Sequence, residues 1–301
     1  MGKIALAGAN GQLGRAIALR AAQSGIPLHR LTRAQLDITD RTAVLDLVGA
    51  LMPVAIINAA AYTAVDRAES EAAAAFAVNR EAPAHLADAC ATAGVPLIHL
   101  STDYVFDGAK QGTYTEDDRA APINVYGASK FAGEEAIRRR CPRHVILRTS
   151  WLYGAHGGNF VKSILRLARE RDRLRIVDDQ RGCPTYADDL AEAVLAIAAR
   201  LQAASDATPF GTFHCAGSGT TTWFRFARRI VELASPAIGR QPAVEAIVTA
   251  DYPTPARRPA NSALDCRRLA ETYGLSLRSW EAALPEMLGT VLAVEPRAEN
   301  A

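Results

Sequence analysis

The 301-residue sequence has few cysteines and none of the spacings that bind zinc or build a disulfide framework. Its five cysteines are scattered, and no two are arranged as Cys-x-x-Cys. Unpaired cysteines are typical of proteins in a reducing compartment, so we expect a cytoplasmic protein. The five are Cys90, Cys141, Cys183, Cys215 and Cys266.

The sequence also lacks a basic leader, an apolar run long enough to cross a membrane, and an excess of charge of one sign. The formal net charge is +2, and 49% of the residues are hydrophobic. Residues 165–175 hold five arginines, but Glu170 and Asp172 alternate with them, which indicates a solvated helix face rather than a nucleic-acid site. We therefore expect a globular protein whose partners are neither membranes nor nucleic acids.

Short apolar runs alternate with helical patterns in the first half of the chain. The patterns predict strands at residues 3–7, 27–31, 54–58, 95–100 and 145–148, and helices at residues 12–23 and 42–51. The runs lack the polar alternation of half-exposed strands, as buried parallel strands do. The sequence thus predicts a Rossmann-like α/β fold, a doubly wound parallel sheet that binds ligands beyond the carboxyl ends of its strands.

The pattern loosens after about residue 153. Helices are predicted at residues 160–171, 187–202, 223–233 and 280–292, between loops that contain proline and glycine. We expect residues 1–152 to form the Rossmann domain and residues 153–301 to form mainly a smaller C-terminal substrate-binding lobe, with some segments returning to the Rossmann domain. Residues 295–301 are polar enough to fray.

Three glycines at every third position follow the first predicted strand. In GANGQLG, Gly8 would allow a tight turn, Gly11 would let a pyrophosphate approach the backbone, and Gly14 would let the next helix pack on the strand. The spacing is not Gly-x-Gly-x-x-Gly, and a flexible turn is the alternative. The strand before it and the helix after it favour an NAD(P) site, with the helix N-terminus facing the phosphates.

The second strand ends on Leu31, Thr32 and Arg33, without the acidic residue that binds the ribose of NADH. The guanidinium of Arg33 would bind a 2′-phosphate, which favours NADPH as cofactor and leaves NADH as the second choice. A solvated surface arginine is the alternative interpretation. The third strand ends in NAAAYT, whose small side chains would let a ribose or adenine lie on the backbone or would simply pack closely.

The sequence NVYGASK places Tyr126 four residues before Lys130, on one face of a helix. A tyrosine has a pKa near ~10, so proton transfer at neutral pH needs its anion stabilised by roughly 3 to 4 kcal/mol, which a nearby ammonium would supply. The pair alone also fits an ordinary aromatic residue and a solvated lysine. Upstream, HLSTDYVFDG puts Ser101 and Thr102 at the end of a strand, where a hydroxyl would bind a substrate carbonyl.

With these motifs the sequence resembles the extended short-chain dehydrogenase/reductase family and, within it, the dTDP-4-dehydrorhamnose reductases. The likeness spans nearly the whole chain, and its most specific parts are RTSWLYG from Arg148 and YPTPARRPANS from Tyr252. The other matching stretches are GANGQLG, NAAAYTAVDRAES, STDYVFDG, NVYGASK and DDQRGCPT.

The resemblance implies hydride transfer from NADPH or NADH to C4 of dTDP-4-dehydro-L-rhamnose. It implies that Tyr126 protonates the carbonyl oxygen, that Lys130 lowers the tyrosine pKa and binds the nicotinamide ribose, and that Thr102 orients the carbonyl. It places the nucleotide sugar on Thr102, Asp103 and Trp151, with Arg258 and Asn159 near the diphosphate. A helix N-cap is the alternative role for Asp37. The motifs and the resemblance together predict these cofactor contacts: Gly8, Asn10, Gly11, Gln12, Leu13, Gly14, Arg33, Asp37, Ile38, Ala60, Ala61, Tyr62, Tyr126 and Lys130.

Two departures and two alternatives accompany the resemblance. Tyr62 stands where the family often has histidine, and the glutamates that hold a magnesium ion between subunits of some relatives have no match here. We expect no metal at the chemistry and leave magnesium and a homodimer open. The alternatives are a similar non-catalytic regulatory subunit of methionine adenosyltransferase and a reductase of another nucleotide-linked 4-keto-6-deoxy sugar. The intact set of Thr102, Tyr126 and Lys130 favours an enzyme.

Overall fold

Parallel strands form the central sheet of the chain, whose computed structural model describes residues 2–203 and 209–294. In these residues the sheet has six strands in the order β10-β5-β4-β3-β1-β2, and every neighbouring pair is parallel. The order reverses direction between β1 and β3, which is the point where such sheets bind ligands. The strands are β1 (Ile4–Ala7), β2 (Leu28–Leu31), β3 (Ala55–Asn58), β4 (Leu97–Thr102), β5 (His144–Thr149) and β10 (Gly211–His214).

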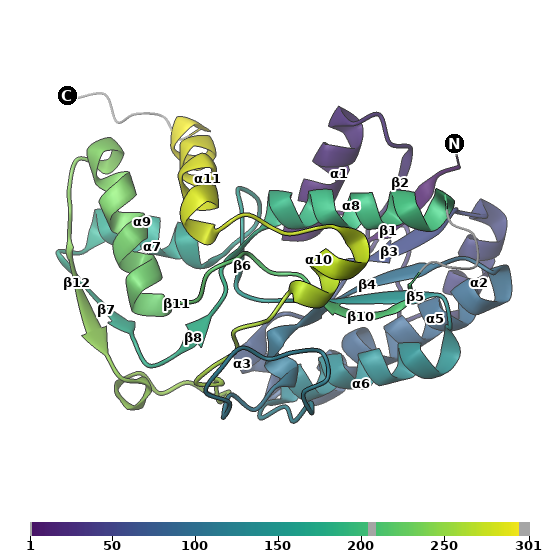
Figure 1. The fold of residues 1–301 in the computed structure, drawn as a ribbon, viewed down its shortest axis with the longest axis horizontal. Helices are drawn as coiled ribbons and strands as arrows, with labels where there is room; N and C mark the ends of the chain where they lie inside the picture. The colour runs from purple at the N-terminus through teal and green to yellow at the C-terminus, as the bar shows by residue number, and fades with distance from the viewer. Residues whose placement is uncertain (1, 204–208, 295–301) are drawn as a thin grey trace.

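Helices cover both faces of this sheet, which confirms the predicted Rossmann-like fold. Successive strand side chains point to opposite faces, so Ile57 packs with α1 (Gln12–Gln23) and α8 (Ala187–Ala203), whereas Ile56 packs with α2 (Arg41–Leu51) and α5 (Ala82–Ala93). In Figure 1, α1 and α8 lie above the sheet, and α5 and α6 (Val125–Arg140) lie below it. The inner strands β1, β3 and β4 are therefore buried on both faces, as their unbroken apolar runs predict, whereas the edge strand β2 is partly exposed.

Short elements join these layers at the carboxyl edge of the sheet. Between β3 and α5 the chain forms α3 (Val65–Ala68), α4 (Ala72–Phe76) and a π-helix, η1 (Ala77–Glu81). The 3₁₀ helix η2 (Asp103–Val105) follows β4 directly, and α10 (Arg267–Tyr273) lies beside the β10 edge.

A second apolar core is built from residues after the fifth strand. Tyr153, Phe226 and Trp280 lie at its centre, and this lobe is on the left of Figure 1. Its small strand pairs are β7–β12 and β6–β9, both parallel, and β8–β11, which is antiparallel. Its elements are β6 (Leu152–Tyr153), α7 (Phe160–Glu170), β7 (Arg173–Val177), β8 (Arg181–Gly182), β9 (Thr185–Tyr186), β11 (Thr221–Thr222), α9 (Trp223–Ile238), β12 (Ala243–Ile247), the 3₁₀ helix η3 (Thr249–Asp251) and α11 (Trp280–Val294).

The arginine-rich stretch at residues 165–175 is not one helix, so that part of the prediction is wrong. The helix α7 ends at Glu170 and β7 begins at Arg173, and within β7 Leu174 is buried whereas Arg173 and Arg175 are exposed. Alternating burial in β7 follows from its pairing with β12, a partner that is distant in sequence. Arg166 pairs with Glu170 and Arg173 pairs with Glu245, which leaves these arginines in a mixed-charge surface.

Two segments of the second half return to the Rossmann core. The strand β10 extends the sheet beyond β5, and α8 packs along α1. The division of the chain at residue 152 stays a prediction, and the expected fraying of residues 295–301 lies outside the described residues. Among the described helices, none has the length and apolar character needed to span a bilayer.

Candidate active site

A cleft of about 670 Å³ opens at the carboxyl ends of β1, β3 and β4. Its lining comes from the loops after β1, β2 and β3, from Val78 of η1, from the end of β4 and from the first turns of α6. Beyond these it includes Thr149, Trp151, Leu152, Gly158 and Asn159. It therefore spans the point where the strand order reverses. All the residues expected at the site line this cleft except Gly14 and Arg258.

The glycine loop forms the end of the cleft beside α1. Gly8 has φ of +78°, and a Cβ there would lie 2.5 Å from the backbone nitrogen of Ala60. A Cβ on Gly14 would lie 2.1 Å from the carbonyl oxygen of Gly8, so Gly14 serves the packing of α1 on β1 rather than the cleft wall. No side chain caps the first turn of α1, and Gln12 and Leu13 line the cleft there. This close, positively polarised backbone fits a dinucleotide pyrophosphate.

Arg33 and Asp37 lie exposed at the mouth of the cleft after β2. The carboxylate of Asp37 accepts hydrogen bonds from the backbone nitrogen and hydroxyl of Thr39, at 3.0 and 2.7 Å, and these bonds hold its pKa below the ordinary value. The N-cap of α2 is Asp40, whose carboxylate accepts from the backbone nitrogen of Ala43. The helix-cap alternative for Asp37 is therefore wrong, because Asp37 closes the preceding turn instead.

Asn79 in the π-helix η1 holds the loop after β3 in place. Its side chain accepts from the backbone nitrogen of Tyr62 and donates to the carbonyl of Tyr62, at 2.9 and 3.0 Å, and it also donates to the hydroxyl of Ser129 on α6. The phenol of Tyr62 donates to Glu71 at 2.6 Å. Sequence reasoning missed Asn79, because the π-turn that aims it inward leaves no apolar period to detect.

Thr102 and Tyr126 meet where β4 ends and α6 begins. The hydroxyl of Thr102 donates to Asp103 at 3.1 Å and accepts from the backbone nitrogen of Tyr104, and it lies near enough to the phenol of Tyr126 to lower the pKa of that phenol. The hydroxyl of Ser101 points elsewhere and donates to Glu134 at 2.5 Å. Of the two hydroxyls predicted at this strand end, only Thr102 thus lies beside the tyrosine.

Burial sets the proton affinities of Tyr126 and Lys130. It raises the pKa of Tyr126 to about 12, with a further rise from Asp103 and an opposing effect from the hydrogen bond with Thr102. Burial lowers the pKa of Lys130 to about 8, against the charge of Glu134. The amine of Lys130 donates to the carbonyl of Leu100 at 2.6 Å. The phenol consequently keeps its proton at neutral pH and is available as an acid.

Asp103 and Trp151 form the wall of the cleft toward the second lobe. Burial raises the pKa of Asp103 to about 6, although hydrogen bonds from Ser262, Ser150 and Thr102 oppose the rise. Trp151 has φ of +45°, which is uncommon for a bulky residue. Its indole stacks on Trp223 with ring centroids 3.4 Å apart, which gives the cleft a flat apolar surface.

A hydroxyl that sequence reasoning missed lies beside this wall. Thr149, at the end of β5, lines the cleft, and its hydroxyl is buried without a hydrogen-bond partner in the part of the chain that the structure describes. A hydroxyl in this condition is available to a bound ligand. In the sequence, only its position directly after Arg148 in the RTSWLYG motif indicated that Thr149 belongs to the site.

Asn159 and Arg258, expected near the diphosphate, have different surroundings. The amide of Asn159 lines the cleft and donates to Gln12 at 3.1 Å, so it links α7 to the glycine loop. Arg258 lies outside the lining and pairs with Asp66 of α3, with nitrogen–oxygen distances of 2.5 and 2.8 Å. In this structure Arg258 therefore fastens the segment between η3 and α10 (residues 252–266, called the C-terminal segment below) to α3.

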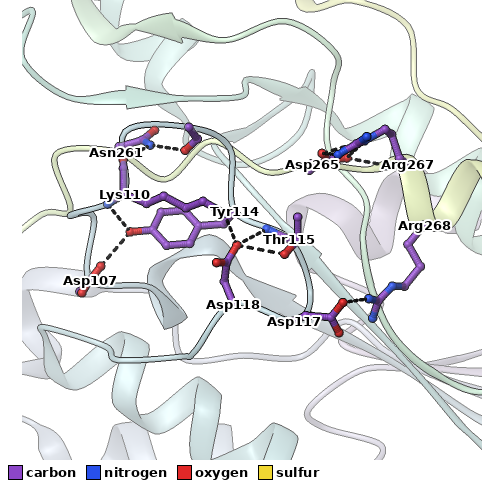
Figure 2. A network of polar contacts seen from close by, with 11 residues as sticks. Asp107, Lys110, Tyr114, Thr115, Asp117, Asp118, Asn261, Asp265, Arg267 and Arg268 are labelled. Atoms are coloured by element: carbon purple, nitrogen blue, oxygen red, sulfur yellow. Dashed lines mark hydrogen bonds and ion pairs between the residues drawn. The ribbon is translucent and has the colours of Figure 1, made fainter.

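The chain between Thr102 and Tyr126 is held by the same C-terminal segment, as Figure 2 shows. The phenol of Tyr114 donates to Asp107 at 2.7 Å and accepts from the backbone nitrogen of Lys110. Asn261 donates to the carbonyls of Lys110 and Gly112. These bonds fix the loop that separates Thr102 from Tyr126 in the sequence. No group of three acidic, histidine or cysteine side chains within residues 2–203 and 209–294 is arranged to hold a metal.

The fold and the cleft together define an NAD(P)-dependent oxidoreductase of the extended short-chain dehydrogenase/reductase class. The family model described as the RmlD substrate binding domain matches residues 2–293. The chain belongs to this family.

The chain is similar in sequence and structure to named relatives over nearly its whole length. It is 48% identical over 291 residues to a dTDP-4-dehydrorhamnose reductase of Sinorhizobium fredii, covering 96% of this chain and 98% of that protein. A solved dTDP-4-dehydrorhamnose reductase of Clostridium acetobutylicum superposes with a TM-score of 0.90 at 37% identity, covering 96% and 99% of the two chains. The dTDP-4-dehydrorhamnose reductase of Bacillus anthracis, solved in complex with NADP, superposes with a TM-score of 0.89 at 35% identity, and the coverage of the two chains is again 96% and 99%.

Proposed function

We infer that this chain reduces the C4 keto group of dTDP-4-dehydro-L-rhamnose with NADPH and yields dTDP-L-rhamnose. The observation that carries the inference is the intact set of Thr102, Tyr126 and Lys130 in the cleft that the glycine loop also lines. The likeness to reductases of this name over nearly the whole chain identifies the sugar nucleotide.

We propose that the cofactor binds along the loops after β1, β2 and β3. NADPH supplies the hydride that the reaction needs. The first turn of α1 would bind its pyrophosphate through backbone N–H groups, and Arg33 would bind its 2′-phosphate. The small residues Ala60 and Ala61 leave room for the cofactor on the backbone after β3. The further proposed contacts are Asn10, Gln12, Leu13, Asp37, Ile38 and Tyr62.

Tyr126 is the proposed acid. As the hydride reaches C4, the carbonyl oxygen gains charge and takes the phenolic proton, and solvent later returns a proton to the phenolate. The hydroxyl proton of Thr102, which points to Asp103 in this structure, would turn to the developing oxyanion, and the positive charge of Lys130 would stabilise the phenolate. The net reaction consumes one NADPH and one proton for each ketone reduced.

The substrate would lie between Thr102 and the second lobe. Asp103 and Trp151 line that side of the cleft, and the indole offers an apolar face to the sugar or base. We propose that residues 153–301 are mainly the substrate-binding lobe, because their own apolar core adjoins this wall.

We also propose that the protein acts in the cytoplasm. Its five cysteines are unpaired, and four of them are buried, which suits a reducing compartment.

The reaction is tested with purified protein and substrate formed in situ from dTDP-glucose by the preceding enzymes. The absorbance of reduced nicotinamide should fall, and the product should be dTDP-L-rhamnose. Binding of NADPH without oxidation would favour a regulatory protein, and oxidation with a different sugar product would reassign the substrate.

A further inference from the structure

Behind Lys130, two buried polar side chains from adjacent strands form a line of hydrogen bonds that the proposed reaction leaves unexplained. Asn58 ends β3, and His99 is its register partner on β4. Both side chains are fully buried, and Lys130 is 2% exposed. Burying polar groups costs free energy of folding unless each group makes its hydrogen bonds.

The orientation of the Asn58 amide determines which atom donates in each of these hydrogen bonds. Its side-chain oxygen accepts from the backbone nitrogen of Ala60 at 3.1 Å, so its amide nitrogen faces Nδ1 of His99, also at 3.1 Å. An amide nitrogen only donates, so Nδ1 must accept. Burial, with the charges of Lys130 and His144, keeps the pKa of His99 well below its ordinary value. The ring is therefore neutral and carries its proton on Nε2.

That proton faces the amine of Lys130. The distance from Nε2 of His99 to Nζ of Lys130 is 3.4 Å, and the carbonyl of Leu100 lies 2.6 Å from the same amine. An Nε2–H group donates to the lone pair of a neutral amine, but it offers no acceptor to an ammonium ion. The carbonyl accepts from either state of the amine. His99 thus favours the neutral amine, while Leu100 holds its position.

We propose that Asn58 and His99 are positioning residues that hold the amine of Lys130 at β4 and, through the tautomer that Asn58 imposes on His99, control whether the amine carries its third proton. The proposal rests on the proposed function in one respect, because the charge of Lys130 matters through the phenolate of Tyr126. Through this control, the pair sets the pH range in which the lysine stabilises that phenolate.

The other charged groups around the amine do not provide this control. Glu134 on α6 favours the ammonium, but Arg148 of β5 and Arg138 of α6 bind its carboxylate at 2.7 and 2.6 Å. Tyr126 on α6 is neutral at physiological pH, with Asp103 beyond it. His144 of β5 affects His99 rather than the lysine.

Asn58→Asp reverses the direction of the bonds. One carboxylate oxygen still accepts from Ala60, and the other accepts a proton carried on Nδ1 of His99. The lone pair of Nε2 then faces Lys130 and accepts from an ammonium. We expect the midpoint of Lys130 titration to rise by roughly one pH unit. The chain has only four lysines, Lys3, Lys110, Lys130 and Lys162, so ¹³Cε NMR resolves the titration, with Lys130→Arg to assign the signal.

The matched control places Asn58→Asp in a His99→Phe background, where the new charge remains but the imidazole is gone. Adding Asn58→Asp to the His99→Phe variant should raise the midpoint of Lys130 titration clearly less than adding Asn58→Asp to the wild-type protein. Equal rises in the two backgrounds would overturn the proposal, because charge alone would then explain them.

A second measurement needs no substitution in the site. Ring ¹⁵N NMR of the wild-type protein should show His99 protonated on Nε2, and protonation on Nδ1 would contradict the proposal even if Asn58→Asp fails to fold. The pH profile of reduction should shift with the lysine midpoint. If the midpoints behave as expected and no reduction occurs with any variant, the proposed function fails, while the proposed control of Lys130 by Asn58 and His99 stands.

Discussion

Tyr126 is the residue on which the proposed chemistry depends most. Tyr126→Phe removes the transferred proton and leaves the ring in place, so turnover should fall by a factor on the order of a hundred or more while NADPH still binds. Initial rates and a fluorescence titration of the cofactor measure the two effects separately.

Tyr273→Phe is the matched control, because it removes a phenol that donates to the carbonyl of Pro209 outside the cleft. Its turnover should stay near that of the wild-type protein. Near wild-type turnover in Tyr126→Phe would assign the proton to another group.

Arg33 is the residue that would distinguish the two nicotinamide cofactors. Arg33→Ala should weaken NADPH more than NADH, because only NADPH carries the 2′-phosphate. Dissociation constants for both cofactors give the ratio, and Arg30→Ala removes another exposed arginine that does not line the cleft. An equal loss for both cofactors would show that Arg33 does not select between them.

The sequence was sufficient to predict most of the side chains that line the cleft, although it added Arg258 and missed Thr149, and it did not predict which way they point. Ser101 and Thr102 were equivalent as hydroxyls at a strand end. They face opposite sides of β4. The hydroxyl of Ser101 donates its hydrogen bond to the buried carboxylate of Glu134, whose charge is balanced by Arg148. A pair formed by residues on different elements has no local signature, and the same holds for Arg258 with Asp66.

Among the elements, the contact of β1 with α1 is tested most sharply at Gly14. Gly14→Ala places a Cβ 2.1 Å from the carbonyl oxygen of Gly8, and backbone atoms have to move to accept it. We expect a loss of roughly 1–3 kcal/mol in the free energy of unfolding and weaker NADPH binding. Denaturant titration and cofactor titration measure both.

Gly49→Ala is the control for this substitution. Gly49 is also a helical glycine, but a Cβ there meets nothing within 4 Å. It should stabilise the protein by about 0.5–1 kcal/mol, as alanine does in a helix. Similar gains from both variants would show that α1 does not need the glycine.

Elements with a local period were predicted well, and elements that depend on distant partners were not. The helix predicted at residues 12–23 has those bounds, and the five predicted strands differ by one or two residues at their ends. The short strands of the second lobe were missed, because β7, for example, has one apolar face and becomes a strand through its pairing with β12. The π-helix η1 was missed for the same kind of reason.

For the molecule as a whole, the cleft is completed by both halves of the chain. Asn159 of the second lobe bonds Gln12 of the glycine loop, and Trp151 faces the end of β4. The C-terminal segment also fixes the loop between Thr102 and Tyr126. The proposed sites for substrate, cofactor and acid therefore lie together where the sheet adjoins the second lobe.

The most direct measurement runs the reductase assay with NADPH deuterated at the transferred position of C4 of the nicotinamide. Mass spectrometry and NMR of the sugar nucleotide then locate the label. We predict one deuterium at C4 of dTDP-L-rhamnose for each NADPH oxidised. Oxidation without the label in that position, or NADPH binding with no oxidation, would contradict the proposed hydride transfer.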